Sequence, residues 1–490
     1  MSGRGLRRVV IVGYGMAGAR FAEQLRSRDP DGERVAVTAI GEEKHHPYNR
    51  VLLSTVVDGS LGRDGVALQA AGWAAEHGVD LRLGVGAAEL DRVGRVITLS
   101  DGSTVDYDVA VLATGARPWL PPVEGLAGVG GEPAAGVVAF RTLDDCEQIQ
   151  HTARTGAAVA VLGGGVLGLE AACALARRGV PVTVVHPVEH LMERQLDPGA
   201  AGVLARVLTG LGIEVRVGAE VRRWTPGYGL ELADGRVVTA DLVIVSAGMK
   251  PATDLARRAG LVVDRGVVVD DALRTSDFRV HAIGDCAQHP GTPSGLVQPA
   301  WEQAAVLADL VTGTDVSARY TGSPPVTRFK ARDVDLMALG DSLVGLDAAD
   351  SEVLCVTNAG RGRYAKLVVR DDKVAGAIVL GAPAAAAAIT QFYDRDLPVP
   401  LDRLALVLGR TALVGGSEAP DPVDLPDTTV VCRCNAVTKS ALVSAWHEGA
   451  RGVAELVSRT RATTGCGGCA HAVGRLADWL STTGNADALT

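Results

Sequence analysis

Short apolar runs, each ended by a glycine turn, recur along residues 1–290 of the chain. The run Val9–Val12 leads into the turn Gly13–Gly15, a helix-like pattern follows, and the apolar run "RVAVTAI" comes next. The same order returns in "AAVAVLGGGVLGLEAACALARRGVPVTVVH". Short β-branched runs that alternate with helices are typical of parallel sheets with helices on both faces. The pattern therefore predicts two α/β units of the same kind.

Both glycine turns have the spacing G-x-G-x-x-G, and the two copies lie 150 residues apart. In such a turn the first glycine permits the tight bend, the second lets the backbone approach a pyrophosphate, and the third lets helix pack on strand. The helix N-terminus adds partial positive charge for the phosphates. One copy is a weak signal, whereas two copies between strand and helix are a strong one. We expect dinucleotides to bind at Gly13, Gly15 and Gly18 and at Gly163, Gly165 and Gly168.

The residue that ends the second strand of each unit bears on the ribose of its nucleotide. In the first unit this residue is Glu42, a candidate acceptor for the ribose hydroxyls, with Glu43 as the alternative. In the second unit the strand ends at His186, with Glu189 three residues on. A neutral histidine neither repels a 2′-phosphate nor supplies a firm cation, so we predict NADH use with appreciable tolerance of NADPH. Glu170 is a candidate near the nicotinamide, although a plain helical role fits equally well.

Further strand-and-turn signals place the second unit inside the first. The segments 107–118, 240–251 and 279–288 each show an apolar strand that runs into a turn rich in small residues. Beyond residue 320 the pattern changes to alternating strands and one alanine-rich helix, then to a stretch rich in proline and acidic residues. The expected organisation is a first nucleotide domain (1–118 and 246–318), a second one (119–245), a small α/β domain (320–414), a linker (415–427) and a cysteine module (428–482).

Composition and charge restrict the function classes. The chain has 490 residues, 47% of them hydrophobic, and a formal net charge of −9, which argues against a general nucleic-acid binder. No apolar run reaches the roughly 18–20 residues that a membrane span requires, and the basic N-terminus runs straight into the glycine turn without a signal-peptide pattern. We therefore expect a cytoplasmic protein with no membrane partner. The oligomeric state stays open, a homodimer included.

Two tight cysteine pairs lie near the C-terminus: Cys432 and Cys434, then Cys466 and Cys469, with 31 residues between the pairs. Disulfides are disfavoured in a reducing compartment. Zinc sites usually have two to four residues between the cysteines of each pair, whereas the first pair here has one. The second pair lacks the βαβ context of a thioredoxin-like dithiol. A [2Fe–2S] cluster takes four thiolates. The other cysteines are expected to be small buried hydrophobic residues: Cys146, Cys173, Cys286 and Cys355.

The two glycine turns, "ATGARP" and the Gly284–Asp285 pair together resemble the flavoproteins that have two dinucleotide-binding domains. The resemblance implies FAD in the first domain and NAD(P)H in the second, in two Rossmann-like folds with one inserted in the other. It further implies that Asp285 binds the flavin ribitol, that Thr114 and Gly115 pass close to FAD, that Arg50 lies beside the pyrophosphate or adenine, and that the backbone of Ala88 contacts adenine.

Over residues 1 to about 480 the chain is similar to the large subunit of NAD(P)H-dependent nitrite reductase and to electron-transfer subunits of assimilatory nitrate reductase. The residues that carry this resemblance are "PYNRVLLS", "HLMERQLDPGA", "GLVQPAWEQA" and "YAKLVVRDDKVAGAIVLG". After Ser54 the chain has Thr55, where the rubredoxin-reductase branch has a lysine. This departure puts a lysine–flavin pair in doubt and favours the nitrite-reductase branch.

The cysteine module resembles the bacterioferritin-associated-ferredoxin-like domains, small helical domains in which such pairs hold a [2Fe–2S] cluster. This resemblance favours an iron–sulfur cluster over zinc at Cys432, Cys434, Cys466 and Cys469. Electrons would then pass from NAD(P)H, a two-electron donor, through FAD to the one-electron cluster. Since only 21 residues follow Cys469 and no sirohaem domain is expected there, the acceptor would be a separate nitrate- or nitrite-reducing subunit.

Three other functions are weaker alternatives. A flavin disulfide reductase or NADH oxidase needs a redox cysteine near residues 43–48, where the chain reads "EKHHPY". A ferredoxin- or rubredoxin-type reductase would share the nucleotide domains and deliver electrons to another acceptor. An iron-sensing or iron-storage partner built on the cysteine module is disfavoured by two complete nucleotide units.

Overall fold

The computed structural model describes residues 6–154, 156–291, 295–331, 334–410, 423, 425–432, 437–463 and 469–483. Contacts within the chain divide it into two units. The first comprises Met1–Leu52, Gly62–Pro118 and Met249–Ser323, and the second comprises Leu53–Leu61, Trp119–Gly248 and Pro324–Thr490. The short segment Leu53–Leu61 thus belongs with the second unit, although its neighbours on both sides belong to the first.

The first unit is built on a five-stranded parallel sheet with the order β19-β7-β1-β2-β3. Its strands are β1 (Arg7–Val12), β2 (Val35–Gly41), β3 (Val79–Leu83), β7 (Val109–Leu112) and β19 (Val280–Ala282). Every residue of β7 is buried, as expected for a strand covered on both faces. The chain moves outward from β1 in one direction through β2 and β3 and then returns to β7, so the turns after β1 and β7 open at the edge where such sheets bind ligands.

Helices and smaller sheets complete the first unit. The helices α1 (Met16–Arg28) and α8 (Val297–Thr312) pack against each other, and α1 buries Phe21, Ala22 and Leu25 against the sheet core. The remaining elements are α3 (Trp73–Glu76), α7 (Asp254–Arg258), an antiparallel sheet of β4 (Ala87–Asp91), β5 (Val96–Leu99) and β6 (Thr104–Asp106), and the two-stranded pairs β8 (Ala116–Pro118) with β17 (Met249–Pro251) and β18 (Val267–Val268) with β20 (Ala287–Gln288).

The second unit contains a parallel sheet of the same kind, with the order β12-β11-β10-β16-β9. Its strands are β9 (Val137–Ala139), β10 (Val159–Leu162), β11 (Val182–Val185), β12 (Ile213–Arg216) and β16 (Leu242–Val245). Around it lie α2 (Leu53–Val57), α4 (Leu143–Thr152), α5 (Val166–Arg177), α6 (Pro198–Gly210) and an antiparallel sheet of β13 (Val221–Thr225), β14 (Gly229–Leu232) and β15 (Val237–Val238). Helix α2 packs on α4 and α5, and Gln150 Nε2 donates to the Val56 carbonyl at 2.6 Å. These contacts explain why Leu53–Leu61 groups with this unit.

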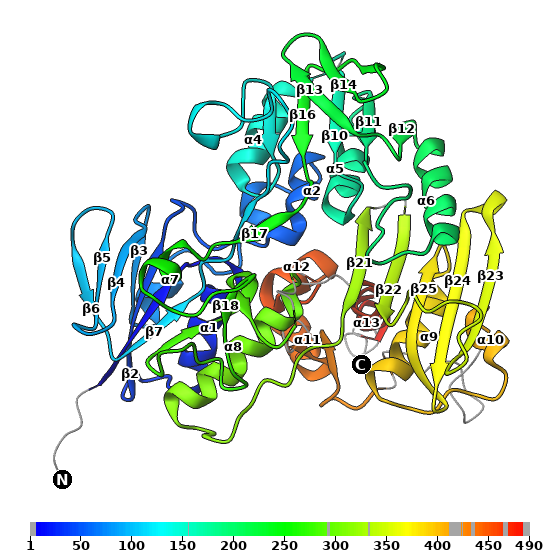
Figure 1. Cartoon of the computed structure of the whole chain (residues 1–490). Coiled ribbons are helices and arrows are strands. Elements are labelled where there is room, and N and C mark those ends of the chain that lie inside the picture. Colours follow the sequence, from blue (N-terminus) through cyan, green and yellow to red (C-terminus); the bar gives the residue numbers. More distant parts are fainter. Residues whose placement is uncertain are drawn as a thin grey trace. The chain divides into compact units, whose positions relative to one another are not determined.

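A third sheet follows in the second unit, drawn in yellow-green and yellow in Figure 1, and all its pairings are antiparallel. In spatial order its strands are β21 (Val326–Ala331), β22 (Val334–Gly340), β25 (Lys373–Leu380), β24 (Arg363–Arg370) and β23 (Glu352–Asn358). The helices α9 (Pro383–Asp394) and α10 (Arg403–Val407) pack on it. Asp197 caps α6 and also accepts hydrogen bonds from Tyr364 at 2.8 Å and from the buried Lys366 at 3.0 Å, which links this sheet to α6.

The C-terminal module is a small helical domain with its own core. Its elements are β26 (Val430–Cys432), β27 (Val437–Thr438), α11 (Lys439–His447), α12 (Val453–Thr460) and α13 (Ala470–Thr483). The core includes Leu442, Leu456 and Leu476 from the three helices. Of the expected linker 415–427, most lies outside the described residues, but its end is anchored here, since Lys439 Nζ donates to the carbonyls of Val423 and Leu425 at 2.7 Å each.

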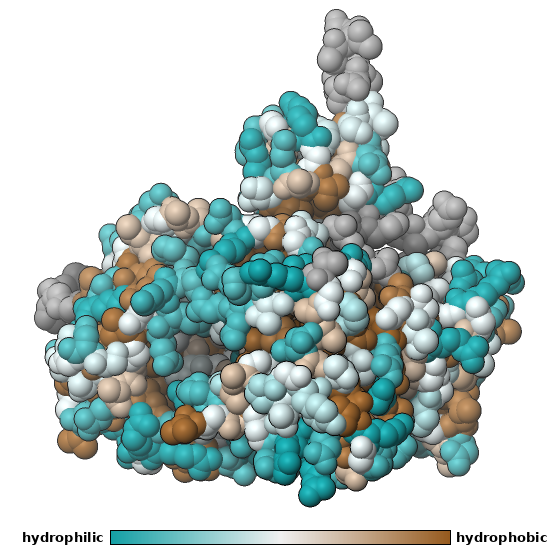
Figure 2. All heavy atoms as spheres, turned by 90° about the horizontal axis from the view of Figure 1, so that it is seen from above, coloured by the Kyte–Doolittle hydropathy of each residue, from teal (hydrophilic) through white to brown (hydrophobic). Residues whose placement is uncertain are grey.

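The architecture confirms the predicted fold class: two Rossmann-like units, a small α/β domain and a small helical domain. Cys146, Cys173 and Cys286 are buried as predicted, but the prediction for Cys355 is wrong, since this residue is exposed. It lies on β23, which within the described residues is an edge strand of its sheet. Within the described residues no helix combines the length and hydropathy that a membrane crossing needs. On the face shown in Figure 2, hydrophilic and apolar residues are interspersed.

Candidate functional site

The first glycine turn lies between β1 and α1 and uses its three glycines differently. Gly13 has a φ of +103°, and a Cβ there would lie 2.2 Å from the Ala113 carbonyl oxygen. A Cβ on Gly18 would lie 2.0 Å from the carbonyl oxygen of Gly13. At Gly15 the nearest atom to a Cβ is 4.0 Å away, on Arg50. The first and third glycines are therefore required because a side chain there would collide with backbone, while the middle glycine leaves its backbone open to a ligand.

Thr114, Gly115 and Asp285 are placed at the same edge of the sheet as this turn. Thr114 and Gly115 follow β7, which pairs with β1, and Asp285 follows β19, which pairs with β7. Thr114 Oγ1 donates to the Ala252 carbonyl at 2.7 Å, which holds the turn after β7 in place. The fold thus brings three residues from distant segments to the carboxyl edge of one sheet, where parallel sheets bind nucleotides.

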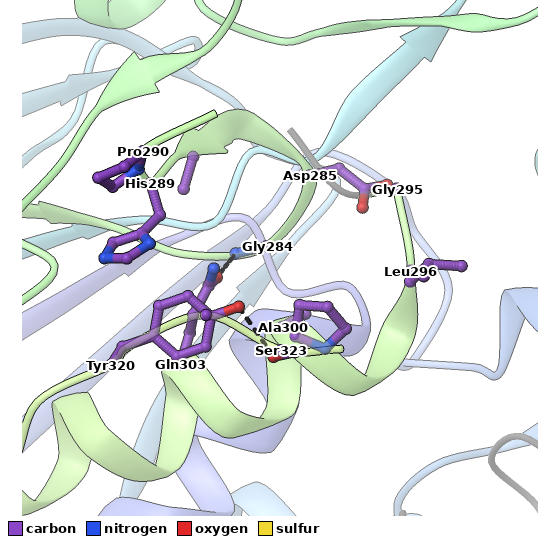
Figure 3. Close-up of a pocket in the computed structure, with 13 residues that line it drawn as sticks. Gly284, Asp285, His289, Pro290, Gly295, Leu296, Ala300, Gln303, Tyr320 and Ser323 are labelled. Atoms are coloured by element: carbon purple, nitrogen blue, oxygen red, sulfur yellow. Dashed lines mark hydrogen bonds between the residues drawn. The ribbon is translucent and has the colours of Figure 1, made fainter. Parts of the chain in front are cut away.

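Asp285 faces a pocket of about 140 Å³ between the turn after β19 and the first turns of α8 (Figure 3). Gln303 reaches from α8 and accepts a hydrogen bond from the Gly284 N–H at 2.8 Å. Beside Gln303 the Tyr320 hydroxyl lies 2.9 Å from Ser323 Oγ, and His289 Nε2 lies 2.8 Å from Asp271. The walls are thus held by hydrogen bonds among themselves, so the pocket is preformed.

Next to this pocket, Cys286 is fully buried and its thiol donates to the carbonyls of Leu112 and Ile283, both at 3.3 Å. Burial raises the pKa of the Cys286 thiol. A buried thiol with a raised pKa is unreactive, so Cys286 is a structural residue despite its position beside Asp285.

The two candidate acids at the end of β2 have different environments. Glu43 pairs with Arg50 and accepts a hydrogen bond from the Tyr48 hydroxyl at 2.7 Å. Burial works to lower the pKa of Arg50, but Tyr48, Glu43 and Asp285 together raise it, so the guanidinium stays charged. Glu42 is exposed and has no hydrogen-bond or ion-pair partner within the described residues. Of the two acids, Glu42 is the one with oxygens available for a ribose.

Asn49 is a further candidate that the sequence analysis did not single out. It is 1% exposed, and its amide nitrogen Nδ2 has no hydrogen-bond partner within the described residues. A buried donor without a partner is costly, so an acceptor from a bound ligand is the simplest way to satisfy it. Because Asn49 precedes Arg50, which reaches toward Gly15, a phosphate-bearing nucleotide fits this donor set. Its place in "PYNR" was the only signal in the sequence.

Ala88 lies in β4 at a point where the pairing with β5 shifts register. Its carbonyl accepts a hydrogen bond from Arg258 at 3.0 Å. The strand starts near the expected ribose position, since a Cβ on Gly86 would lie 3.7 Å from Glu42. The placement brings the backbone of this strand to the same end of the sheet as Glu42.

The second glycine turn repeats the geometry of the first. Gly163 has a φ of +125°, and a Cβ there would lie 2.2 Å from the Ser246 carbonyl oxygen. A Cβ on Gly168 would lie 2.4 Å from the Gly163 carbonyl oxygen, whereas one on Gly165 would meet no atom within 4 Å. Glu170 is buried within α5. The open backbone at Gly165, at the start of α5, fits a dinucleotide pyrophosphate.

His186 follows β11 and packs directly against this turn. It is 6% exposed, and its Nδ1 accepts the N–H of Gly164 at 3.1 Å. Its Nε2 lies 3.1 Å from a carboxylate oxygen of Glu193. Both ring nitrogens are therefore engaged within the protein, and Glu193 is a second residue that the sequence analysis missed.

The C-terminal module brings two of the four expected metal ligands to one core. Cys432 is buried in that core, Cys469 packs against it, and Cys434 and Cys466 lie outside the described residues. The N–H of Thr463 donates to Cys469 Sγ at 3.2 Å. Cysteine sulfurs that bind iron–sulfur clusters commonly accept hydrogen bonds from backbone N–H groups, so the described residues fit a [2Fe–2S] cluster.

Comparison with protein families gives three matches along the chain. The family described as pyridine nucleotide-disulphide oxidoreductase matches residues 7–304. The rubredoxin NAD+ reductase C-terminal domain matches residues 325–393, and the BFD-like [2Fe-2S] binding domain matches residues 430–478.

Two relatives and one solved structure are similar to most of the chain. The assimilatory nitrate reductase electron transfer subunit of Bacillus subtilis (strain 168) is 32% identical over 94% of this chain and 58% of its own. The nitrite reductase [NAD(P)H] large subunit of Klebsiella oxytoca is 34% identical over 96% of this chain and 49% of its own. The chain thus spans about half the length of these relatives. The covalent putidaredoxin reductase–putidaredoxin complex matches with a TM-score of 0.73 and 26% identity over 82% of this chain and 95% of the matched chain.

Proposed function

Because the chain belongs to the pyridine nucleotide-disulphide oxidoreductase family and is an FAD-dependent NAD(P)H oxidoreductase with a [2Fe–2S] domain, we propose that it delivers electrons to a separate nitrate- or nitrite-reducing protein. The relatives confirm the predicted resemblance to nitrate and nitrite reductases, and the family matches confirm the predicted cofactors. The observation that carries the proposal is a cysteine module that follows two complete nucleotide units in the sequence and gathers Cys432 and Cys469 at one hydrophobic core.

In this proposal the residues of the first unit hold FAD. Gly15 and the N-terminus of α1 lie at the pyrophosphate, Glu42 accepts from the ribose, and Asn49 and Arg50 supply donors beside it. Asp285, with Thr114, Gly115 and the backbone of Ala88, completes the set. When bound, FAD accepts a hydride from the nicotinamide and releases electrons singly, which a [2Fe–2S] cluster requires.

In the second unit Gly163, Gly165 and Gly168 form the turn for NAD(P)H, while Glu170 lies on the helix α5 and His186 directly follows the strand β11. In the C-terminal module Cys432, Cys434, Cys466 and Cys469 are the proposed cluster ligands. The Thr463 N–H, 3.2 Å from Cys469 Sγ, orients that ligand and withdraws charge from it. We place the enzyme in the cytoplasm, where thiolates stay reduced and NAD(P)H is available.

The acceptor class rests on what the similar proteins are. One relative is named as the electron transfer subunit of a nitrate reductase, and the similar solved structure is a covalent complex of putidaredoxin reductase with putidaredoxin. Both support a separate acceptor protein. A disulfide reductase is disfavoured, because residues 43–48 contain no cysteine and Cys286 is an inert buried thiol. A reductase in which FAD itself serves a ferredoxin- or rubredoxin-type acceptor is the second candidate, favoured by the matched rubredoxin-reductase domain.

Replacement of one cluster ligand separates these two functions. In the full chain Cys469→Ser should lose iron, about two atoms per chain, but keep FAD and the NADH-driven reduction of ferricyanide. The same variant should fail to drive nitrite or nitrate reduction by an added reductase subunit. Cys355→Ser is the matched control, since Cys355 is exposed on β23 and distant in sequence from the module.

The comparison of three preparations is decisive. Wild type and Cys355→Ser should drive the added subunit equally, and Cys469→Ser should not. If Cys469→Ser drives it at the wild-type rate, electrons leave from FAD and the second candidate function is correct. Stoichiometric zinc and no iron in anaerobically purified wild type would contradict the cluster itself.

A further inference from the structure

The carboxyl end of β11 lacks the acid that a dinucleotide-binding unit usually presents to the ribose. In such units an Asp or Glu near the end of the second strand binds the 2′-hydroxyl of NAD, and its charge disfavours the 2′-phosphate of NADP. Here the residue that follows the strand is His186, whose ring carries no negative charge. The question is whether another residue supplies the missing carboxylate.

The contacts of His186 fix which ring nitrogen carries the proton. Nδ1 accepts the Gly164 N–H at 3.1 Å, so it bears no hydrogen in this arrangement. The proton is then on Nε2, which donates to Glu193 at 3.1 Å. A Cβ on Gly164 would lie 2.7 Å from the imidazole, so the ring packs directly against the backbone of the glycine turn. His186 is thus a fixed donor that holds one oxygen of Glu193.

The backbone around Glu193 is folded onto the same glycine turn. The N–H of Met192 donates to the Gly164 carbonyl at 3.0 Å, and Met192 itself has a φ of +51°. A left-handed conformation is costly for a residue other than glycine, so the tertiary contacts impose it. Its effect is to turn the chain at Met192 and to set Glu193 beside His186.

The carboxylate that results is accessible. The Glu193 side chain is 33% exposed, against 8% for that of His186. Its Oε2 is engaged with His186, while its Oε1 has no hydrogen-bond partner within the described residues. Glu193 therefore offers one open carboxylate oxygen near the strand end, although it lies seven residues after His186 in sequence.

Building on the function proposed above, we infer that Glu193 is the residue that selects NADH over NADPH. It accepts a hydrogen bond from the 2′-hydroxyl of the adenosine ribose and repels a 2′-phosphate. His186 is the positioning residue that holds it there. The preference for NADH is then stronger than the strand-end histidine alone predicts.

Three other charged residues lie near the end of β11 in sequence or in the sheet, and their surroundings differ from those of Glu193. Glu189 lies against Gly218, where a Cβ would be 3.1 Å from its carboxylate. Arg216, at the end of β12, is paired with Glu214 at 2.8 Å. Arg194 is exposed and, within the described residues, has no hydrogen bond or ion pair, which makes it the cation that a 2′-phosphate would use if the inference were wrong.

The test measures binding without hydride transfer. Full-length protein loaded with FAD is titrated calorimetrically with ADP-ribose and with 2′-phospho-ADP-ribose, and the ratio of the two dissociation constants is the readout. For Glu193→Gln and for Glu193→Ala the ratio should fall by about tenfold or more, as expected when a like charge near the surface is removed. The matched control Glu189→Gln removes the same charge four residues away and should change the ratio by less than about twofold.

Each outcome bears on the inference. An unchanged ratio in both Glu193 variants, or an equal shift in Glu189→Gln, would overturn it, as would a wild type that binds the 2′-phosphorylated ligand more tightly through Arg194. The Glu193 variants must also unfold at a temperature close to that of wild type, so that the change in the ratio of dissociation constants is not an effect of misfolding. If wild type binds neither ligand, the proposed NAD(P)H site itself fails, and that result is distinct from a bound ligand with an unchanged ratio.

Discussion

Replacement of single glycines in the second nucleotide turn separates the demands of folding from those of binding. Gly165 has a φ of −83° and a ψ of 175°, values that alanine adopts freely, and a Cβ there meets no atom within 4 Å. Gly163, two residues earlier, has a φ of +125°, and a Cβ there would lie 2.2 Å from the Ser246 carbonyl oxygen. The two variants Gly165→Ala and Gly163→Ala add the same methyl group to the same turn.

The magnitudes follow from these surroundings. At the N-cap position of α5, Gly165→Ala costs up to about 1 kcal/mol in lost capping. The reduced freedom of the unfolded chain offsets about 0.4–1 kcal/mol of this cost. The free energy of unfolding should therefore change by less than about 1 kcal/mol. Gly163→Ala combines a backbone conformation that L-residues avoid with a collision against backbone, so we expect a loss of more than about 4 kcal/mol.

Binding should show a separate effect for Gly165→Ala. The new methyl group occupies the space through which a pyrophosphate approaches the backbone, so at least one charge-assisted hydrogen bond is lost. Such a bond contributes about 1.5–3 kcal/mol, which weakens NADH binding roughly 10- to 100-fold. Urea unfolding measures the stability, and titration with NADH measures the dissociation constant. Wild-type affinity in Gly165→Ala would refute the assignment of this turn to the pyrophosphate.

Three further predictions test other parts of the chain. Gly15→Ala, at the corresponding open position of the first turn, should fold but retain less FAD after gel filtration. Burial lowers the pKa of His281 from 6.5 to about 4. As the pH falls, the unfolded chain is protonated at this residue before the folded chain, so the His281 contribution to stability should be constant above pH 6.5 and should decline by about 3 kcal/mol as the pH falls to 4. His281→Leu should remove this pH dependence from the urea unfolding midpoints. Lys366→Met leaves the Asp197 carboxylate without its buried cation, so the thermal unfolding midpoint should fall by an amount equivalent to about 3 kcal/mol; an unchanged midpoint would show that Tyr364 and the Ala200 N–H satisfy Asp197 without the lysine.

The pattern of the sequence was sufficient for the parts of this protein that depend on local physics. Gly13 and Gly163 were predictable because a positive φ between a strand and a helix demands glycine, whatever else the chain does. The buried strands and the two cysteine pairs were also predictable from local sequence, because the hydrophobic period and the spacing of the ligands are both visible within a short segment of the chain.

Tertiary structure alone decided the residues whose role depends on a distant segment. Asn49 became a candidate only when the fold buried its amide without a partner. Glu193 reaches the glycine turn because Met192 adopts a left-handed conformation and His186 holds the carboxylate, and no local pattern encodes that pairing. Cys355 is exposed because the sheet order makes β23 an edge strand, and strand order is set by long-range packing that hydrophobic period along the chain does not specify.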